Sequence, residues 1–240
     1  MYRFSFSIVC LFLSVAVFAQ KDSVVKKIIE PKQIRIGLDI SRPILNAFYN
    51  DRYGYEASVD YYRGNEKYWV LEGGFGGSNI DYDNLKYTSN NSFLRFGFEK
   101  SMVPRLYKSD WDYLFFGMRY GLAFINRSEA SFTTSDNVWG TTLGTVSSKN
   151  FTGHWLEING GIRVEIFKNI FAGYNLRAKF MLNQNPFKEL PPAYVAGYGK
   201  GEKATNFDLN FFLLYALRWK WFFFKKEHKN HFMKMGLKYF

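Results

Sequence analysis

The stretch FAGYNLRAKFML, residues 171–182, alternates apolar and polar side chains along its whole length. Arg177 and Lys179 lie in the middle of this apolar segment, which is incompatible with a strand buried on both faces. A β-strand places successive side chains on opposite faces of its sheet. The pattern therefore predicts a strand with one wholly apolar face and one polar face that carries charges at its centre.

Seven further segments share this period of two, so the sequence predicts eight strands. They cover residues 34–40, 55–61, 69–76, 94–99, 114–124, 156–166, 172–182 and 208–219. Charged side chains are confined to the polar faces. With Lys220 they form a balanced set of eight acids and eight bases: Asp39, Glu56, Asp60, Glu72, Glu99, Glu157, Glu165, Asp208, Arg35, Arg95, Arg119, Arg163, Arg177, Lys179, Arg218 and Lys220.

Two architectures produce such strands, because the apolar faces form either the core of a soluble β-protein or the lipid-facing wall of a membrane barrel. Glycines lie mostly on the polar faces, where a narrow lumen requires small residues. Several strands exceed ten residues, and aromatic residues such as Trp69, Trp111 and Trp219 cluster beside the short turns. These features favour an all-β, antiparallel transmembrane β-barrel of eight strands. A secreted soluble β-protein and a ten-stranded barrel are the alternatives.

The predicted connections alternate in length. Short connections occupy residues 63–67, the neighbourhood of Pro104 and residues 168–170, whereas long ones occupy 42–52, 79–91, 126–152 and 184–206. Outer-membrane barrels have short periplasmic turns and long external loops. The barrel, residues 33–223, is therefore expected to begin and end in the periplasm.

The N-terminus has the features of an export signal. Residues 1–19 combine Arg3, an apolar run and small residues at Val17 and Ala19, which predicts a signal peptide cut before Gln20. The sole cysteine, Cys10, leaves with it, so disulfides and thiol chemistry are not expected in the mature chain. Residues 20–32 form a predicted periplasmic segment.

The C-terminal residues 224–240 are predicted to be a basic tail or an extra strand. The sequence FMKMGLKYF at their end has strand character, and Ala193–Tyr198 is a second place where a strand is easily overlooked. If both segments were strands, the barrel would have ten. The interpretation adopted is eight strands with a tail.

The charge of the chain is unevenly distributed. The formal charge is +11, and the mature chain without Arg3 carries +10. The polar faces cancel and the long loops sum to +1, so about +9 falls on the periplasmic segments. This favours anionic phospholipid headgroups or an acidic periplasmic partner. A nucleic-acid partner is not expected for an exported chain without a compact basic motif.

The alternating strands resemble the small outer-membrane β-barrels of the OmpA and OmpX class. The AQ cleavage site, LPPAYVAGYGK at residues 190–200 and the terminal GLKYF resemble an uncharacterised family of Bacteroidota outer-membrane proteins. The resemblance implies a barrel in the outer membrane of such a bacterium. The triplet Asp22-Ser23-Val24 also resembles the O-glycosylation acceptor of that phylum.

Catalytic and metal-binding candidates are sparse. His154, Ser147, Ser148 and Glu157 lie near one loop base, as a lipid-modifying hydrolase would require. His228 and His231 lie three residues apart in the tail without a supporting carboxylate, which is a weak metal pattern. We therefore expect no enzyme activity, no metal and no cofactor.

The remaining candidates concern binding and transport. Eight strands leave a lumen that side chains just fill, so the balanced charges should pair into a closed network, whereas ten strands would leave a narrow pore. The loop at residues 190–203 is the best candidate for binding, through Pro191, Pro192, Tyr194 and Tyr198. The expected role is structural, or accessory to a membrane complex such as the barrel-assembly machinery or to a lipoprotein, with outer-membrane lipid as the surroundings.

Overall fold

The computed structural model describes residues 31–49, 51–105, 107, 110–136, 140–223 and 235–239, with side chains up to Trp219 apart from that of Asp136. The predicted signal peptide, the glycosylation triplet at Ser23 and the histidines His228 and His231 lie outside these residues. So does the side chain of Lys220.

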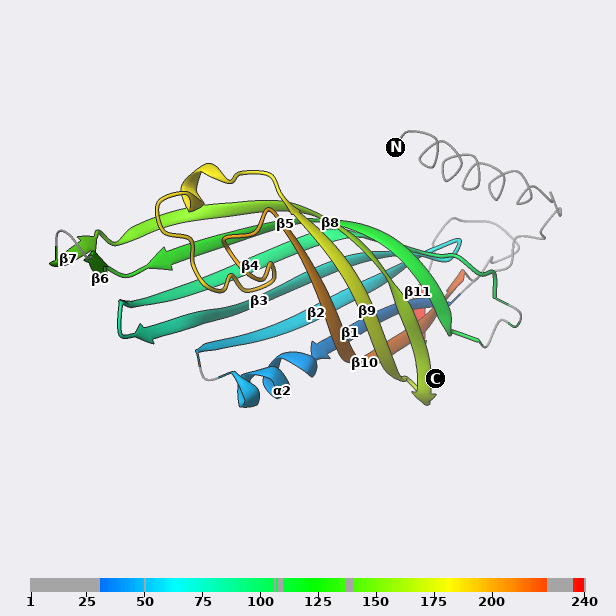
Figure 1. Ribbon diagram of the computed structural model, residues 1–240. Coiled ribbons are helices and arrows are strands. Elements are labelled where there is room, and N and C mark those ends of the chain that lie inside the picture. The colour runs from blue at the N-terminus through cyan, green and yellow to red at the C-terminus, as the bar shows by residue number, and fades with distance from the viewer. Residues whose placement is uncertain are drawn as a thin grey trace, which may run out of the picture. The chain divides into compact units, whose positions relative to one another are not determined.

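Eight strands of an eleven-stranded antiparallel sheet close into a barrel (Figure 1). They are β1 (Lys32–Asp39), β2 (Arg52–Gly64), β3 (Lys67–Tyr82), β4 (Leu85–Ser101), β5 (Tyr113–Arg127), β8 (Lys149–Phe167), β9 (Ile170–Met181) and β10 (Thr205–Phe223). Each strand pairs with the next, and β1 pairs with β10 from Lys32↔Trp219 to Asp39↔Phe212, which completes the ring. This confirms the predicted fold class.

The barrel has an apolar outside and a charged inside. On β9, Leu176 is 55% exposed while its neighbour Arg177 is fully buried, and on β4 the same contrast separates Phe96 from Arg95. The period of two therefore sorts side chains as a membrane barrel does and not as a soluble sandwich. Within the described residues, the structure contains no helix that is long and apolar enough to cross a membrane.

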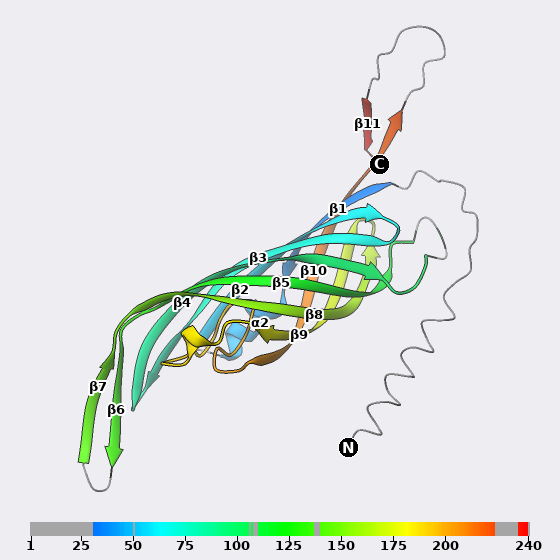
Figure 2. The same cartoon turned by 90° about the horizontal axis from the view of Figure 1, so that it is seen from above.

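Two predicted loops are wrong, because both contain strands. The predicted loop 79–91 is the far half of the β3–β4 hairpin, which turns at residues 83–84. The predicted loop 126–152 contains a second hairpin formed by β6 (Ala130–Asp136) and β7 (Gly140–Val146), which projects beyond the barrel (Figure 2). Most exposed residues of both hairpins are polar, apart from Tyr82 and Leu143, so the hairpins lack the continuous apolar face on which the prediction relied.

The other connections also contain structure. The connection between β1 and β2 includes the helix α2 (Ser41–Phe48), and the β9–β10 connection begins with the 3-10 turn η1 (Asn185–Phe187). At the opposite end, β2 and β3 meet in a tight turn where Asn65 and Glu66 have φ values of 52° and 58°. This geometry is that of a two-residue hairpin turn with positive φ.

The ten-strand alternative is wrong. Residues 193–198 contribute only an isolated bridge between Val195 and Gly199. The C-terminal β11 (Met235–Tyr239) pairs with the end of β10, from Trp219↔Tyr239 to Phe223↔Met235, and does not enter the closed ring. The described chain is thus an eight-stranded barrel with a tail strand.

Candidate functional site

The interior of the barrel is filled by three layers of side chains. The layer nearest the tight β2–β3 turn is aromatic and includes Tyr62, Tyr68, Trp111, Tyr113 and Phe115, all buried. The rings of Tyr68 and Tyr113 stack with centroids 5.0 Å apart. The interior therefore starts with a packed apolar floor.

The floor also holds a cation. Arg35 of β1 is fully buried, and its guanidinium lies 4.1 Å from the centroid of the Tyr68 ring. It hydrogen-bonds the Tyr113 hydroxyl and lies 3.0 Å from a carboxylate oxygen of Asp60. Ring faces and a carboxylate together compensate the loss of water around this charge.

The middle layer is an ionic network. Three arginines (Arg95, Arg119, Arg177) and three glutamates (Glu56, Glu72, Glu157) meet on the barrel axis with almost no solvent exposure. Arg177 illustrates the geometry, because it lies 2.8 Å from Glu56, 3.0 Å from Glu72 and 3.5 Å from Glu157. Arg95 and Arg119 each contact three carboxylates as well.

Glu99 connects the network to the floor. It pairs with Arg119, lies 3.6 Å from Arg163 and accepts a 3.0 Å hydrogen bond from the Tyr113 hydroxyl. Since Tyr113 also receives a hydrogen bond from Arg35, one chain of polar contacts joins the middle layer to the floor.

A smaller ionic cluster lies at the opposite end of the network. Lys179 of β9 donates a 2.6 Å hydrogen bond to Asp208 of β10, which also pairs with Arg42 of α2. Arg42 lies 3.5 Å from Asp39, and Asn210 donates a 2.6 Å hydrogen bond to that same carboxylate. The helix α2 is thereby anchored to the barrel through charges that point inward.

The third layer is a plug made by the loop between η1 and β10, residues 188–204, here called the plug loop. Val195 and Tyr198 are fully buried, and the Tyr198 ring lies 5.5 Å from that of Trp155 on β8. Asn91 holds the loop with a 3.1 Å bond to the Tyr194 carbonyl and a 2.5 Å bond from the Ala196 amide. Arg95 donates a 3.0 Å bond to the Gly197 carbonyl, so the plug loop rests directly on the ionic layer.

The plug loop fits only because of a glycine. Gly197 has a φ of +76°, and a Cβ at this position would lie 2.6 Å from the Phe93 ring. A residue with a side chain would strain the backbone and clash with the barrel wall.

Burial affects the tyrosines of the plug loop. Desolvation raises the pKa of Tyr194, although Arg42 nearby acts in the opposite direction. Burial likewise raises the pKa of Tyr198. At the start of β2, beside the plugged mouth, the hydrogen bond from Arg52 lowers the pKa of Asp51. The plug tyrosines are therefore neutral at ordinary pH.

A family model matches most of the chain. The model describes a domain of unknown function (DUF6048) and matches residues 1–220. The chain belongs to this family. Among curated proteins no sequence matches this DUF6048 chain.

Two solved structures are similar to the DUF6048 chain. The N-terminal β-barrel domain of Pseudomonas aeruginosa OprF is 13% identical, with a TM-score of 0.32, over 78% of this chain and 99% of the other. Ail, the attachment invasion locus protein of Yersinia pestis, is 8% identical, with a TM-score of 0.37, over 79% of this chain and 97% of the other.

The structure places fifteen of the sixteen predicted lumenal charges of the DUF6048 chain on the inner face, and the side chain of the sixteenth, Lys220, lies outside the described residues. Twelve are buried: Arg35, Asp39, Glu56, Asp60, Glu72, Arg95, Glu99, Arg119, Glu157, Arg163, Arg177 and Lys179. The side chains of Asp208, Glu165 and Arg218 are 16–19% exposed near the ends, where Arg218 lies 2.7 Å from Glu165.

Two inward cations were assigned to external loops, and both assignments are wrong. Arg127 is 1% exposed and donates 2.8 Å bonds to the carbonyls of Leu190 and Ser147. It continues the inward positions of β5, so extending the period of two by two steps, from Ala123 through Ile125, identifies it. Arg42 lies in the helix α2, and the strand pattern does not predict the directions of helical side chains.

The predicted binding loop lacks the surface assigned to it. Tyr194 and Tyr198 are 7% and 0% exposed, because their rings fill the barrel mouth. Pro192 is buried, and the Pro191 carbonyl accepts a 3.3 Å bond from the Tyr87 hydroxyl. The segment seals the barrel and does not present a tyrosine contact surface.

The predicted catalytic group is dispersed. His154 faces outward and contacts the Tyr120 hydroxyl at 2.7 Å, whereas Glu157 faces inward and pairs with arginines. Lys149 begins β8, and five residues of strand place His154 about 17 Å beyond it, out of reach of Ser147 and Ser148. Within the described residues, no group of three or more His, Cys, Asp or Glu side chains has an arrangement that could hold a metal ion.

Proposed function

We propose that this protein is an integral outer-membrane β-barrel with a closed interior and a structural or accessory role in the cell envelope. The observation that carries the proposal is the outer wall. Leu38, Phe96 and Leu176 are 53–63% exposed, and many other large apolar side chains on the eight strands are about 40% exposed or more, far more than a soluble monomer leaves as one continuous surface. A lipid bilayer is the solvent in which such a wall is stable.

The orientation follows from the connections. The tight turn between β2 and β3 and the two-residue turn between β8 and β9 lie at one end, where the chain also enters β1. The projecting hairpins, α2 and the plug loop lie at the other end (Figure 1). Short turns are typical of the periplasmic side, so the plugged mouth faces outward.

The filled interior supports a role other than transport. An ion crossing the barrel must displace the aromatic floor, disrupt the arginine–glutamate layer and move the plug loop. Breaking a buried pair leaves an uncompensated charge at a cost of about 3–5 kcal/mol, so a resting conductance is not expected. The dispersed His154 group supports a non-enzymatic role.

The accessory form of the proposal concerns partners. The basic segments at both ends of the sequence favour docking to an acidic surface, such as a lipoprotein or a membrane complex that includes the barrel-assembly machinery. The resemblance of the sequence to Bacteroidota export proteins supports a role in the envelope of that group. Affinity purification in mild detergent should recover a stoichiometric partner, and recovery of none contradicts this form.

Heat-modifiability tests the proposal as a whole. We expect the protein in the outer-membrane fraction, where unboiled and boiled samples migrate differently on a gel and planar bilayers show negligible current. A soluble periplasmic protein without a gel shift refutes the barrel in lipid, and a stable, sizeable single-channel current refutes the closed interior. A changed lipid profile in a His154→Ala strain would favour the enzymatic alternative.

A further inference from the structure

Four adjacent strands present a row of cations on the outer wall. The cations are Lys32 of β1, Arg63 of β2, Lys67 of β3 and Lys100 of β4. Lys67 lies directly opposite Lys100 in the β3–β4 register, and the Lys32 amine donates a 3.2 Å bond to the Arg63 carbonyl. The row therefore runs across the strands at one level, close to the β2–β3 turn.

These charges have no anionic partner in the described part of the chain. Among the described residues, no carboxylate lies within 4.0 Å of any of the four cationic groups, although the interior pairs nearly every charge. Like charges directly opposite each other on neighbouring strands destabilise a sheet. The opposed Lys67 and Lys100 therefore favour an anion bound from outside.

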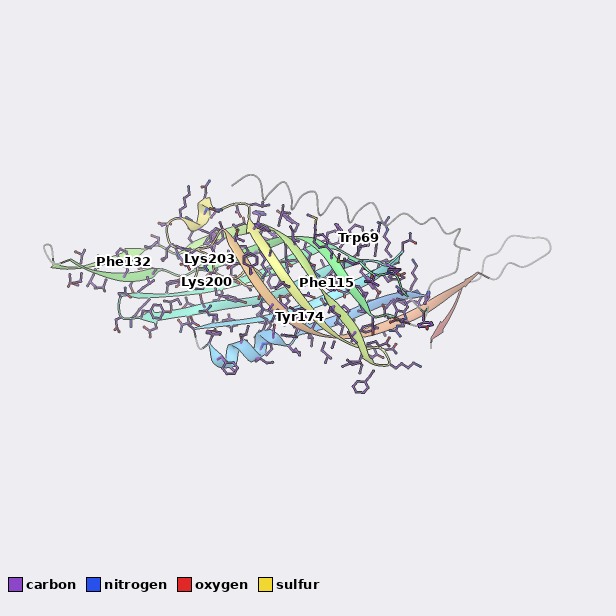
Figure 3. The ribbon with its side chains drawn as sticks, turned by 45° about the vertical axis from the view of Figure 1, so that its right-hand side comes forward. Trp69, Phe115, Phe132, Tyr174, Lys200 and Lys203 are labelled. Atoms are coloured by element: carbon purple, nitrogen blue, oxygen red, sulfur yellow. The ribbon has the colours of Figure 1, made fainter. Side chains whose placement is uncertain are left out.

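An apolar row lies two residues further along each strand. Ile34, Tyr61, Trp69 and Phe98 occupy it and also face outward, with Tyr61 opposite Trp69 and Trp69 opposite Phe98. The Arg63 guanidinium lies 5.6 Å from the Trp69 ring centroid. Figure 3 shows Trp69 toward the end of the barrel that is opposite Phe132 and the plug-loop lysines.

The parts of the two rows that lie on β2, β3 and β4 border a hollow. A cavity of about 280 Å³ is lined by Arg63, Lys67, Tyr68, Trp69, Phe98 and Lys100. Two residues of strand separate cations from apolar side chains by about 7 Å. A ligand that fits must join an anionic group to a hydrocarbon portion at that spacing.

We propose that this hollow, here called the rim site, binds the phosphate headgroup of an anionic phospholipid in the periplasmic leaflet. The phosphate lies among Arg63, Lys67 and Lys100, and the acyl chains lie along Trp69 and Phe98. The inference rests on the proposed membrane insertion, since only an inserted barrel brings these rows to the headgroup level. An acidic protein would satisfy the cations but would leave the adjoining apolar row without its hydrocarbon.

Native mass spectrometry of the full barrel in neutral detergent tests the rim site. The probes are phosphatidylglycerol and phosphatidylcholine, titrated into wild type, Lys67→Gln/Lys100→Gln and the matched control Lys200→Gln/Lys203→Gln. The control removes two exposed lysines from the opposite end of the barrel. Each rim lysine should contribute about five-fold to affinity, so the rim variant should bind phosphatidylglycerol about 25-fold more weakly while the control is unchanged.

Stability gives a second, opposite signature. Without anionic lipid, Lys67→Gln should raise the urea midpoint because it removes the like-charge pair, whereas with phosphatidylglycerol it should lower that midpoint. If Lys67 had only a structural role, its replacement would shift the urea midpoint in the same direction with and without phosphatidylglycerol.

Several outcomes overturn the rim site. It is overturned if the two lipids bind equally, or if the control variant loses as much affinity for phosphatidylglycerol as the rim variant. It is also overturned if millimolar inorganic phosphate displaces the lipid completely. Displacement by an acidic peptide alone, without lipid preference, would assign the row to a protein partner. Failure of the proposed function is a separate result, because the wild-type protein would then show no heat-modifiable band before any lipid is titrated.

Discussion

Removal of Arg177 is the sharpest test of the ionic layer. Its guanidinium donates hydrogen bonds of 2.8 Å to Glu56 and 3.0 Å to Glu72, and it is fully buried. Arg177→Met retains much of the side-chain volume but leaves three glutamates with two arginines. Hydrogen bonds to charged groups contribute about 1.5–3 kcal/mol each, so two of them give about 3–6 kcal/mol. This agrees with the loss of about 3–5 kcal/mol found when one member of a buried pair is removed.

The assay is urea unfolding of the barrel in phospholipid vesicles, followed by tryptophan fluorescence and by the fraction of heat-modifiable band. Arg52→Met is the matched control, because Arg52 pairs with Asp51 at 2.8 Å while both side chains are more than a quarter exposed. An exposed pair contributes at most about 1 kcal/mol. The control should therefore lose far less stability than Arg177→Met.

A second substitution separates charge imbalance from lost packing. Arg177→Met/Glu72→Gln removes the surplus negative charge, and coupling between contacting residues is typically about 0.5–3 kcal/mol. The double variant should therefore be more stable than Arg177→Met alone. The reasoning is refuted if Arg177→Met unfolds at the same urea concentration as Arg52→Met, or if the double variant is the least stable of the set.

Three further predictions concern packing, protonation and the hairpins. A Cβ on Gly121 would lie 2.2 Å from the Trp155 indole, so Gly121→Ala should cost about 1–3 kcal/mol in urea unfolding, and Trp155→Phe should partly restore stability in the double variant. Because burial raises the pKa of Tyr194 and Tyr198, the plug loop is fully stabilised below about pH 10 and loses this stabilisation as pH rises through the raised values. Absorbance titration at 295 nm should show these two tyrosines ionising after the exposed tyrosines, and Tyr194→Phe/Tyr198→Phe should shrink that late phase by two groups; an undiminished late phase contradicts the burial argument. Replacing residues 130–146 by Asn-Gly should leave a heat-modifiable barrel, because the described ladder between β6 and β4 consists of two residue pairs, Leu85↔Phe132 and Lys86↔Ser131, whereas loss of the gel shift would show that the hairpin is needed for folding.

The sequence alone determined the wall of the barrel. A strand exposes its two faces to different surroundings, so an apolar face free of charge and a polar face with Arg177 or Glu157 at its centre favour a barrel with an apolar outer wall and a polar lumen. The alternation of a strand accounts for only one of the two inward arginines that were assigned to loops. Arg127 obeys the period of β5 and was missed only because the strand was ended too early, whereas Arg42 lies on a helix that the rule does not describe.

Only the tertiary structure decided what fills the lumen and how its charges pair. Glu56 and Arg177 are 121 residues apart and meet because the ring closes between β1 and β10. Tyr198 lies against Trp155 because the plug loop folds inward, an outcome that depends on the diameter of an eight-stranded ring as well as on the positive φ of the neighbouring Gly197. Alternation is a property of each strand by itself, but pairing and plugging depend on which strands face one another across the lumen, and ring closure alone fixes that.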